Sequence, residues 1–210
     1  MTQTISRLFD SYSEATGAVH ALEGANIPHD DISVIANNAD GTHAGHANDG
    51  VETRDGVNDH GDVTRGTSTG AVLGGAGGLL AGLGLLAIPG LGPIVAAGWL
   101  AATAAGAGIG AIGGAATGGI VGALKNAGHS DEDAHVFAEG VRRGGTLVSV
   151  RAPEERRSEI EAIFDGHGPV DAASRRQAYR EAGWTKFEAD APAYDAAQVE
   201  RERQPLGSGM

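Results

Sequence analysis

One group of residues in this sequence has the spacing of a nucleotide-binding loop. Gly108, Gly110 and Gly113 satisfy the G-x-G-x-x-G pattern that lets a backbone approach a pyrophosphate. A dinucleotide fold requires a strand before this loop and an acidic residue about 20 positions after it. Here the preceding residues are alanine-rich and typical of a helix, so the pattern is best explained by chance in a glycine-rich chain.

A second group consists of histidines and carboxylates that could ligate a divalent ion. The set is His43, His46, His60, Asp49, Glu52, Asp59 and Asp62. Its spacing matches no tetrahedral zinc motif, and a solvated linker is the favoured interpretation, with weak metal binding as the alternative. No Ser, His and acid set stands out, and the chain has no cysteine. We therefore expect no catalytic residue, no cofactor and no resident metal.

The composition also restricts the class of protein. The 210 residues carry a formal net charge of −12, which makes nucleic acid an unsuitable partner because phosphate binding requires a basic face. Glycine contributes 35 residues and aromatics only 4%, which argues against a conventional enzyme core. The first ten residues lack the pattern of a signal peptide. The expected location is the cytoplasm, or the inner face of the cytoplasmic membrane.

The elements that must carry any function fall into two halves around an insertion. Residues 1–36 predict a strand, a helix capped by Ser11 and a second strand; residues 125–174 predict helix, strand, helix and a last strand near 170–173, with Ser130 capping the first helix. Residues 37–65 are rich in Asn, Asp, Gly and His and predict a flexible acidic linker. The predicted fold class is α+β, with split ferredoxin-like β-α-β halves packed as a four-stranded sheet.

The insertion, residues 66–124, contains no charged residue and has glycines at intervals of four. Such stripes allow two helices to approach closely, as in small-xxx-small packing. The two stripes are mirror-related about residue 94, and the breakers Pro89, Gly90, Gly92 and Pro93 predict a turn there. We therefore expect an antiparallel helical hairpin with arms at 66–88 and 94–124. The predicted contact residues are Gly66, Gly70, Gly74, Gly78, Gly82, Gly106, Gly110, Gly114, Gly118 and Gly122.

The apolar side chains on the outer faces of this hairpin must meet something apolar. Identical subunits in an assembly, a lipid bilayer and the core of the monomer itself are the alternatives, and the sequence does not separate the first two. Both arms are long enough to enter a bilayer, but much of each is Gly and Ala, which gain little from leaving water. The expected partners are therefore other copies of the chain, or a lipid bilayer, and not nucleic acid.

The apolar tip carries a resemblance to a known family. The run from Leu86 to Leu100, LAIPGLGPIVAAGWL, is followed by AEGVRRGGTLV from Ala138 to Val148. Together with the glycine zippers, these segments resemble the bacterial general stress (heat-induced) protein family, over most of the chain up to about Ala173. The resemblance implies two small α/β halves around a glycine-rich hairpin, a stress context and no defined biochemical activity.

The residues beyond 174 contain three aromatics among charges. Trp184, Phe187 and Tyr194 predict either an arm that docks on a neighbouring subunit or a tail that packs on its own domain. The functional expectation is a non-enzymatic, stress-associated structural protein that self-associates through its hairpin into a homo-oligomer or larger assembly. The alternatives are a membrane-inserted hairpin protein acting on bilayer integrity and a small-ligand sensor or enzyme using the α/β domain.

Overall fold

The computed structural model describes residues 2–41, 84–88, 90–109 and 119–203. These residues form an α+β fold, as the sequence predicts. In chain order the elements are β1 (Thr2–Phe9), α1 (Tyr12–Gly24), η1 (His29–Asp31), β2 (Ile32–Asn37), β3 (Gly84–Ile88), β4 (Gly92–Ala97), α4 (Trp99–Ile109), α5 (Gly119–Asn126), α6 (Asp131–Arg142), β5 (Thr146–Pro153), η3 (Glu154–Arg156), α7 (Arg157–Asp165), α8 (Ala172–Glu181) and α9 (Ala196–Arg203).

The strands form one five-stranded sheet in the order β1-β5-β2-β4-β3, and every neighbouring pair is antiparallel. The late strand β5 lies between β1 and β2, with Ser149 opposite both Ser6 and Ser33. The first and last parts of the chain therefore complete a single sheet. The β3–β4 hairpin extends this sheet beyond β2.

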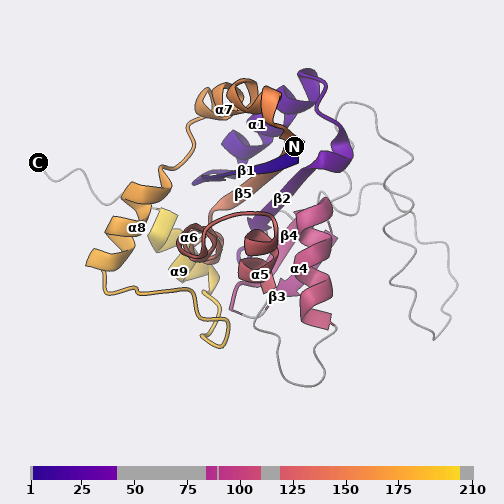
Figure 1. Cartoon of the computed structure of the whole chain (residues 1–210). Helices are drawn as coiled ribbons and strands as arrows, with labels where there is room; N and C mark the ends of the chain where they lie inside the picture. The colour runs from indigo at the N-terminus through magenta and orange to yellow at the C-terminus, as the bar shows by residue number, and fades with distance from the viewer. Residues whose placement is uncertain (1, 42–83, 89, 110–118, 204–210) are drawn as a thin grey trace, which may run out of the picture.

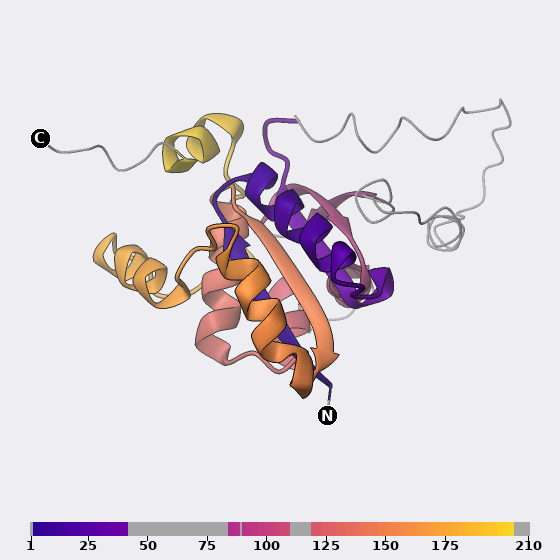
Figure 2. The ribbon, with the colours of Figure 1, turned by 90° about the horizontal axis from the view of Figure 1, so that it is seen from above.

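Helices cover both faces of the sheet (Figures 1 and 2). Along each strand, the side chains of successive residues point to opposite faces of the sheet. In β2, Val34 and Ala36 join the apolar core under α1 and α7, whereas Ile35 joins the core under α4, α5 and α6. Every residue of β2 is buried because both faces of this strand are covered.

Local capping explains where two of the helices begin. The Ser11 side chain accepts a hydrogen bond from the Glu14 backbone N–H at 3.1 Å, and Ser130 does the same for Asp133 at 3.1 Å. Each bond satisfies one of the backbone donors left free at a helix start. Both predicted caps, and the helices that follow them, are confirmed.

The predicted helical arms, 66–88 and 94–124, are helical in α4 and α5. Elsewhere in these two ranges, where the structure describes them, the prediction is wrong. Residues 84–88 and 92–97 are strands, and the chain reverses around Gly90 and Leu91. The physical reason is pairing. Glycine and proline flank the turn and disfavour helix, and β4 gains a ladder with β2 as well as with β3. In the described part of the insertion the helices are α4 and α5, which pack against each other and lie in the predicted second arm or at its end.

The predicted last strand at 170–173 is also wrong, since only Val170 forms a bridge, opposite Leu8. The Asp171 side chain accepts a hydrogen bond from the Ser174 N–H at 2.8 Å, and helix α8 begins at Ala172. Among the described residues the sheet has five strands where four were predicted, because the β3–β4 hairpin adds two strands and the predicted last strand is reduced to one bridge.

Candidate functional site: the two edges of the sheet

Most of the predicted glycine contacts lie outside the described residues. These are Gly66, Gly70, Gly74, Gly78, Gly82, Gly110, Gly114 and Gly118, together with Pro89 of the turn and the linker histidines. Gly106 lies in α4 and Gly122 in α5. Nothing lies within 4 Å of the position that a Cβ on Gly122 would occupy, so this glycine makes no close helix contact among the described residues.

The turn glycines do make a close contact, but with the C-terminal segment. Gly90 and Gly92 have φ of +77° and +79°. A Cβ on Gly90 would lie 2.9 Å from Phe187 Cζ, and one on Gly92 would lie 2.8 Å from Ala193 Cβ. The segment containing Phe187 and Ala193 therefore packs directly on the hairpin turn of its own chain.

The three aromatics proposed as a docking arm all contact the chain's own domain. Phe187 is buried in the core under α4, α5 and α6. The Trp184 ring lies edge-on to Tyr179 of α8, with 5.7 Å between centroids. The Arg142 guanidinium lies 4.8 Å from the centre of the Tyr194 ring. Of the two alternatives, packing on the own domain describes this arrangement.

A buried carboxylate on α6 anchors this C-terminal segment. Glu139 is fully buried and accepts hydrogen bonds from Arg143 Nε at 2.7 Å and Arg142 Nη2 at 3.2 Å. Arg143 also donates to Glu202 of α9 and stacks 4.3 Å above Tyr179. Burial alone would lower the pKa of Arg143, but its hydrogen bond to Glu139 raises that pKa overall. Burial raises the pKa of Tyr179 to about 12. These groups hold α6, α8 and α9 together.

Strand β3 forms one edge of the sheet, and its backbone polar groups can be assigned directions. The Pro93 carbonyl accepts a hydrogen bond from the Asn38 N–H at 3.0 Å, so the polar groups of Pro93 face β2. Its partner across β3–β4 is Ala87, and bonded and non-bonded pairs alternate along an antiparallel ladder. Ala87 and Leu85 therefore direct their N–H and C=O groups away from β4. No described strand pairs with them there.

The β3 edge is also apolar and uncharged. Leu85 is 58% exposed, and it is the exposed large hydrophobic side chain of the described region. No charged residue occurs in β3, β4 or the turn between them. An open backbone edge bearing an exposed leucine is a template for pairing with another strand.

Strand β1 forms the opposite edge, and a cleft of about 530 Å³ runs along it from Thr2 to Arg7. Val170 N–H donates to the Leu8 carbonyl at 2.7 Å, so the backbone N–H and C=O groups of Leu8 point away from β5. By the same alternation Thr2, Thr4 and Ser6 also direct their backbone groups outward, into the cleft. The walls are the α5–α6 connection with His129, the start of α6, Arg7 of β1, and Arg157 of α7.

A hydroxyl–imidazole chain lies at the floor of this cleft. Ser6 Oγ is 2.8 Å from His129 Nε2 and 2.7 Å from Ser149 Oγ. Burial lowers the pKa of His129; Asp133 opposes this and Arg7 adds to it. The pair has the atoms of a nucleophile and its base. Ser6 is only 1% exposed, however, and its oxygen is also hydrogen-bonded to Ser149. These hydrogen bonds therefore join β1, β5 and the loop before α6, and they do not present a nucleophile. Sequence reasoning missed this contact because the partners lie 123 residues apart.

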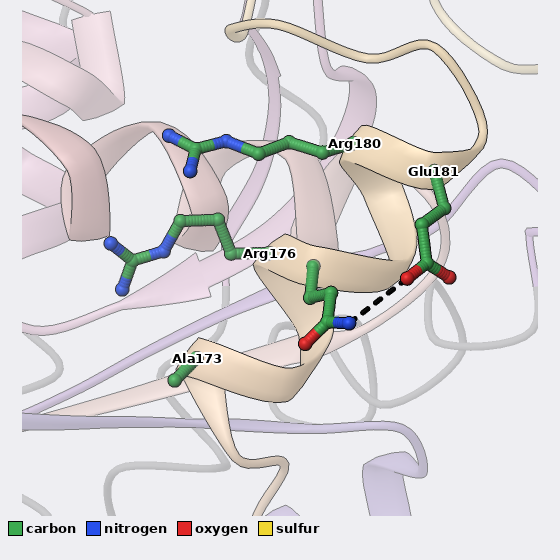
Figure 3. A pocket seen from close by; sticks show the side chains of 5 residues that line it. Ala173, Arg176, Arg180 and Glu181 are labelled. Carbon is green, nitrogen blue, oxygen red and sulfur yellow. Dashed lines mark hydrogen bonds between the residues drawn. The ribbon is translucent and has the colours of Figure 1, made fainter.

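A shallow hollow on α8 carries no site of its own (Figure 3). Arg176 and Arg180 point the same way from α8, toward α6. Arg176 pairs with Glu132 and Asp133, and Arg180 Nη2 is 3.6 Å from Glu132. Both guanidinium groups are therefore already neutralised by the acidic first turn of α6, and they hold the two helices together.

No family model, curated protein or solved structure matches this chain. In the part of the chain that the structure describes, no cluster of three or more His, Asp or Glu side chains could hold a metal ion. Among those same residues, no helix combines the length and the apolar character needed to cross a bilayer.

Proposed function

We propose that this chain is a non-enzymatic structural protein that self-associates through the edge strand β3 of its hairpin. The observation that carries the proposal is that Leu85 and Ala87 direct their backbone N–H and C=O groups away from β4, while the Leu85 side chain is exposed. Two copies related by a two-fold axis at Leu86 would pair antiparallel, with Leu85 of each opposite Ala87 of the other. About four main-chain hydrogen bonds would form, and one sheet would run through both copies.

The distribution of charge supports a second copy as the occupant. Each chain carries a net charge of −12, so two copies repel each other over most of their surface. The hairpin carries no charge, and its edge is where two copies can approach without placing like charges together. Pairing would also cover Leu85, which contributes about 25 cal/mol for each Å² of apolar surface removed from water.

Multi-angle light scattering after size exclusion tests this proposal with three variants. Leu85→Lys places a charge at the edge, and Ala87→Pro removes an outward N–H that β4 does not use. Ala178→Lys adds the same charge at an exposed site on α8 and serves as the control. We expect dimers for the wild type and Ala178→Lys and monomers for the other two. Unchanged mass in both edge variants would exclude β3 as the interface.

Several finer expectations remain part of this proposal. The order Val170, β1, β5, β2 is compatible with a split ferredoxin-like core whose fourth strand is reduced to one bridge. The glycine stripes would add a second, helical contact between copies, and the resemblance to general stress proteins would place the assembly in a bacterial stress response in the cytoplasm.

A hairpin acting on a bilayer is the rival, and detergent-dependent extraction from lysate would favour it. The small-ligand alternative is favoured only by the cleft at β1.

A further inference from the structure

The cleft beside β1 occupies the place of a missing strand. Val170 forms an antiparallel bridge with Leu8, which shows that a chain can pair on this side of β1. The chain then leaves the edge, because Asp171 caps α8 and Ala172 begins the helix. The positions opposite Ser6, Thr4 and Thr2, which a longer strand would have filled, are the cleft.

The backbone lining this slot retains hydrogen-bonding capacity. Thr2 and Thr4 direct their N–H and C=O groups outward, as the Val170 to Leu8 bond establishes for this edge. The Ser6 carbonyl is partly occupied, since it accepts a hydrogen bond from Arg7 Nη1 at 3.0 Å. Strand addition supplies affinity from such main-chain groups and specificity from the flanking side chains.

The rim gives the slot a charge preference. Arg7 and Arg157 both lie at the cleft and share one carboxylate, Glu161, at 3.8 Å and 2.9 Å. Arg157 Nη1 donates to Gln3 at 2.8 Å, and its Nη2 has no partner among the described residues. Two guanidinium groups share one carboxylate on this wall, and the carboxylate that lines the cleft from α6, Asp133, is itself paired with Arg176 at 3.1 Å. The wall formed by Arg7 and Arg157 is therefore positive, on a chain whose net charge is −12. An acidic side chain would complete the pairing.

We propose that the β1 cleft binds an extended acidic peptide segment of a partner protein, added antiparallel to Thr2–Ser6, with a carboxylate at Arg157. The bound segment continues the sheet from the Val170 bridge. This site lies at the opposite edge from β3 and is independent of self-association.

Fluorescence anisotropy with a labelled synthetic peptide, acetyl-Thr-Val-Glu-Val-Thr-amide, tests the proposal on the full-length chain. Thr4→Pro removes an outward N–H that the β1–β5 ladder does not use, and Thr4→Val is the matched control that keeps it. We expect Thr4→Pro to weaken binding at least tenfold and Thr4→Val to leave it within about twofold. Arg157→Gln should weaken binding several-fold, and the exposed change Arg201→Gln should not.

Changes to the peptide keep the test decisive if Thr4→Pro fails to fold. N-methylation of the peptide backbone on the paired side should abolish binding, and replacing its Glu by Lys should weaken it. The proposal is overturned if the N-methylated peptide binds as well as its parent. It is also overturned if inorganic phosphate at matched ionic strength displaces the peptide completely, because the cleft would then be a small-anion site.

Discussion

Single residues determine how closely the layers of this fold approach. Gly98 joins β4 to α4 with φ of +87°, a region that side chains rarely adopt. A Cβ there would overlap the Ile32 carbonyl oxygen and lie 2.7 Å from Ser33 Cα. The turn into α4 can therefore cross β2 only if this position is glycine.

Gly98→Ala should destabilise the protein by about 3 kcal/mol, combining backbone strain with overlap against β2. Gly183→Ala separates the two causes, since Gly183 has φ of +86° but nothing within 4 Å of its Cβ position. We expect that control to cost about 1 kcal/mol. Urea unfolding followed by circular dichroism measures both, and equal losses would show that the overlap is relieved at no cost.

His129 makes stability depend on pH. Burial lowers its pKa below the ordinary value of 6.5, so the unfolded chain binds the proton more tightly than the folded one. The free energy of unfolding should therefore be unaffected by this group above pH 6.5 and should decrease as the pH falls from 6.5 toward the folded pKa.

The variant His129→Gln should remove this dependence while keeping a polar partner for Ser6. Urea unfolding at about pH 5.5, 6.5 and 7.5 should give a smaller loss at the lowest pH in the variant than in the wild type. The carboxylates whose pKa values are lowered, Asp131, Glu159 and Asp171, titrate below this window. Parallel profiles in the two proteins would contradict the assignment to His129.

At the scale of elements, local sequence signals located α1, β2, α6, β5 and α7, because each has a cap or a clear apolar period. The hairpin was misassigned for a physical reason. The glycine stripes end at Gly82 and begin again at Gly106, and the short apolar runs Gly84–Ile88 and Gly92–Ala97 between them are compatible with helix or strand from sequence alone. Pairing with β2 decides between them, and the partners are far apart in sequence: Ala36 lies opposite Val95, 59 residues later.

The candidate sites were harder to predict than the elements. The outward direction of Leu85 depends on which strand lies beyond β4, and the β1 cleft depends on the chain leaving the sheet at Asp171. Neither follows from a residue's own neighbours. A usable signal was present, however: Ser6, Ser33 and Ser149 interrupt apolar strands at positions that share one face. Polar groups at such positions need partners, and one of these is His129.

At the scale of the whole molecule, charge and edge chemistry predict how self-association responds to salt. Two chains of −12 each repel at low ionic strength, and the proposed β3 contact contains no ion pair that salt would weaken. Screening shortens the Debye length from roughly 20 Å near 0.02 M to about 8 Å at 0.15 M. Raising sodium chloride over this range should therefore tighten the dimer several-fold, because it removes repulsion and leaves main-chain hydrogen bonds and leucine burial intact.

Sedimentation equilibrium measures the dimer dissociation constant, with Ala178→Lys as a variant that lowers the repulsion directly and should flatten the salt response. A dimer that weakens with salt would mean that charged pairs hold the copies together, and the interface would then have to lie away from the uncharged hairpin.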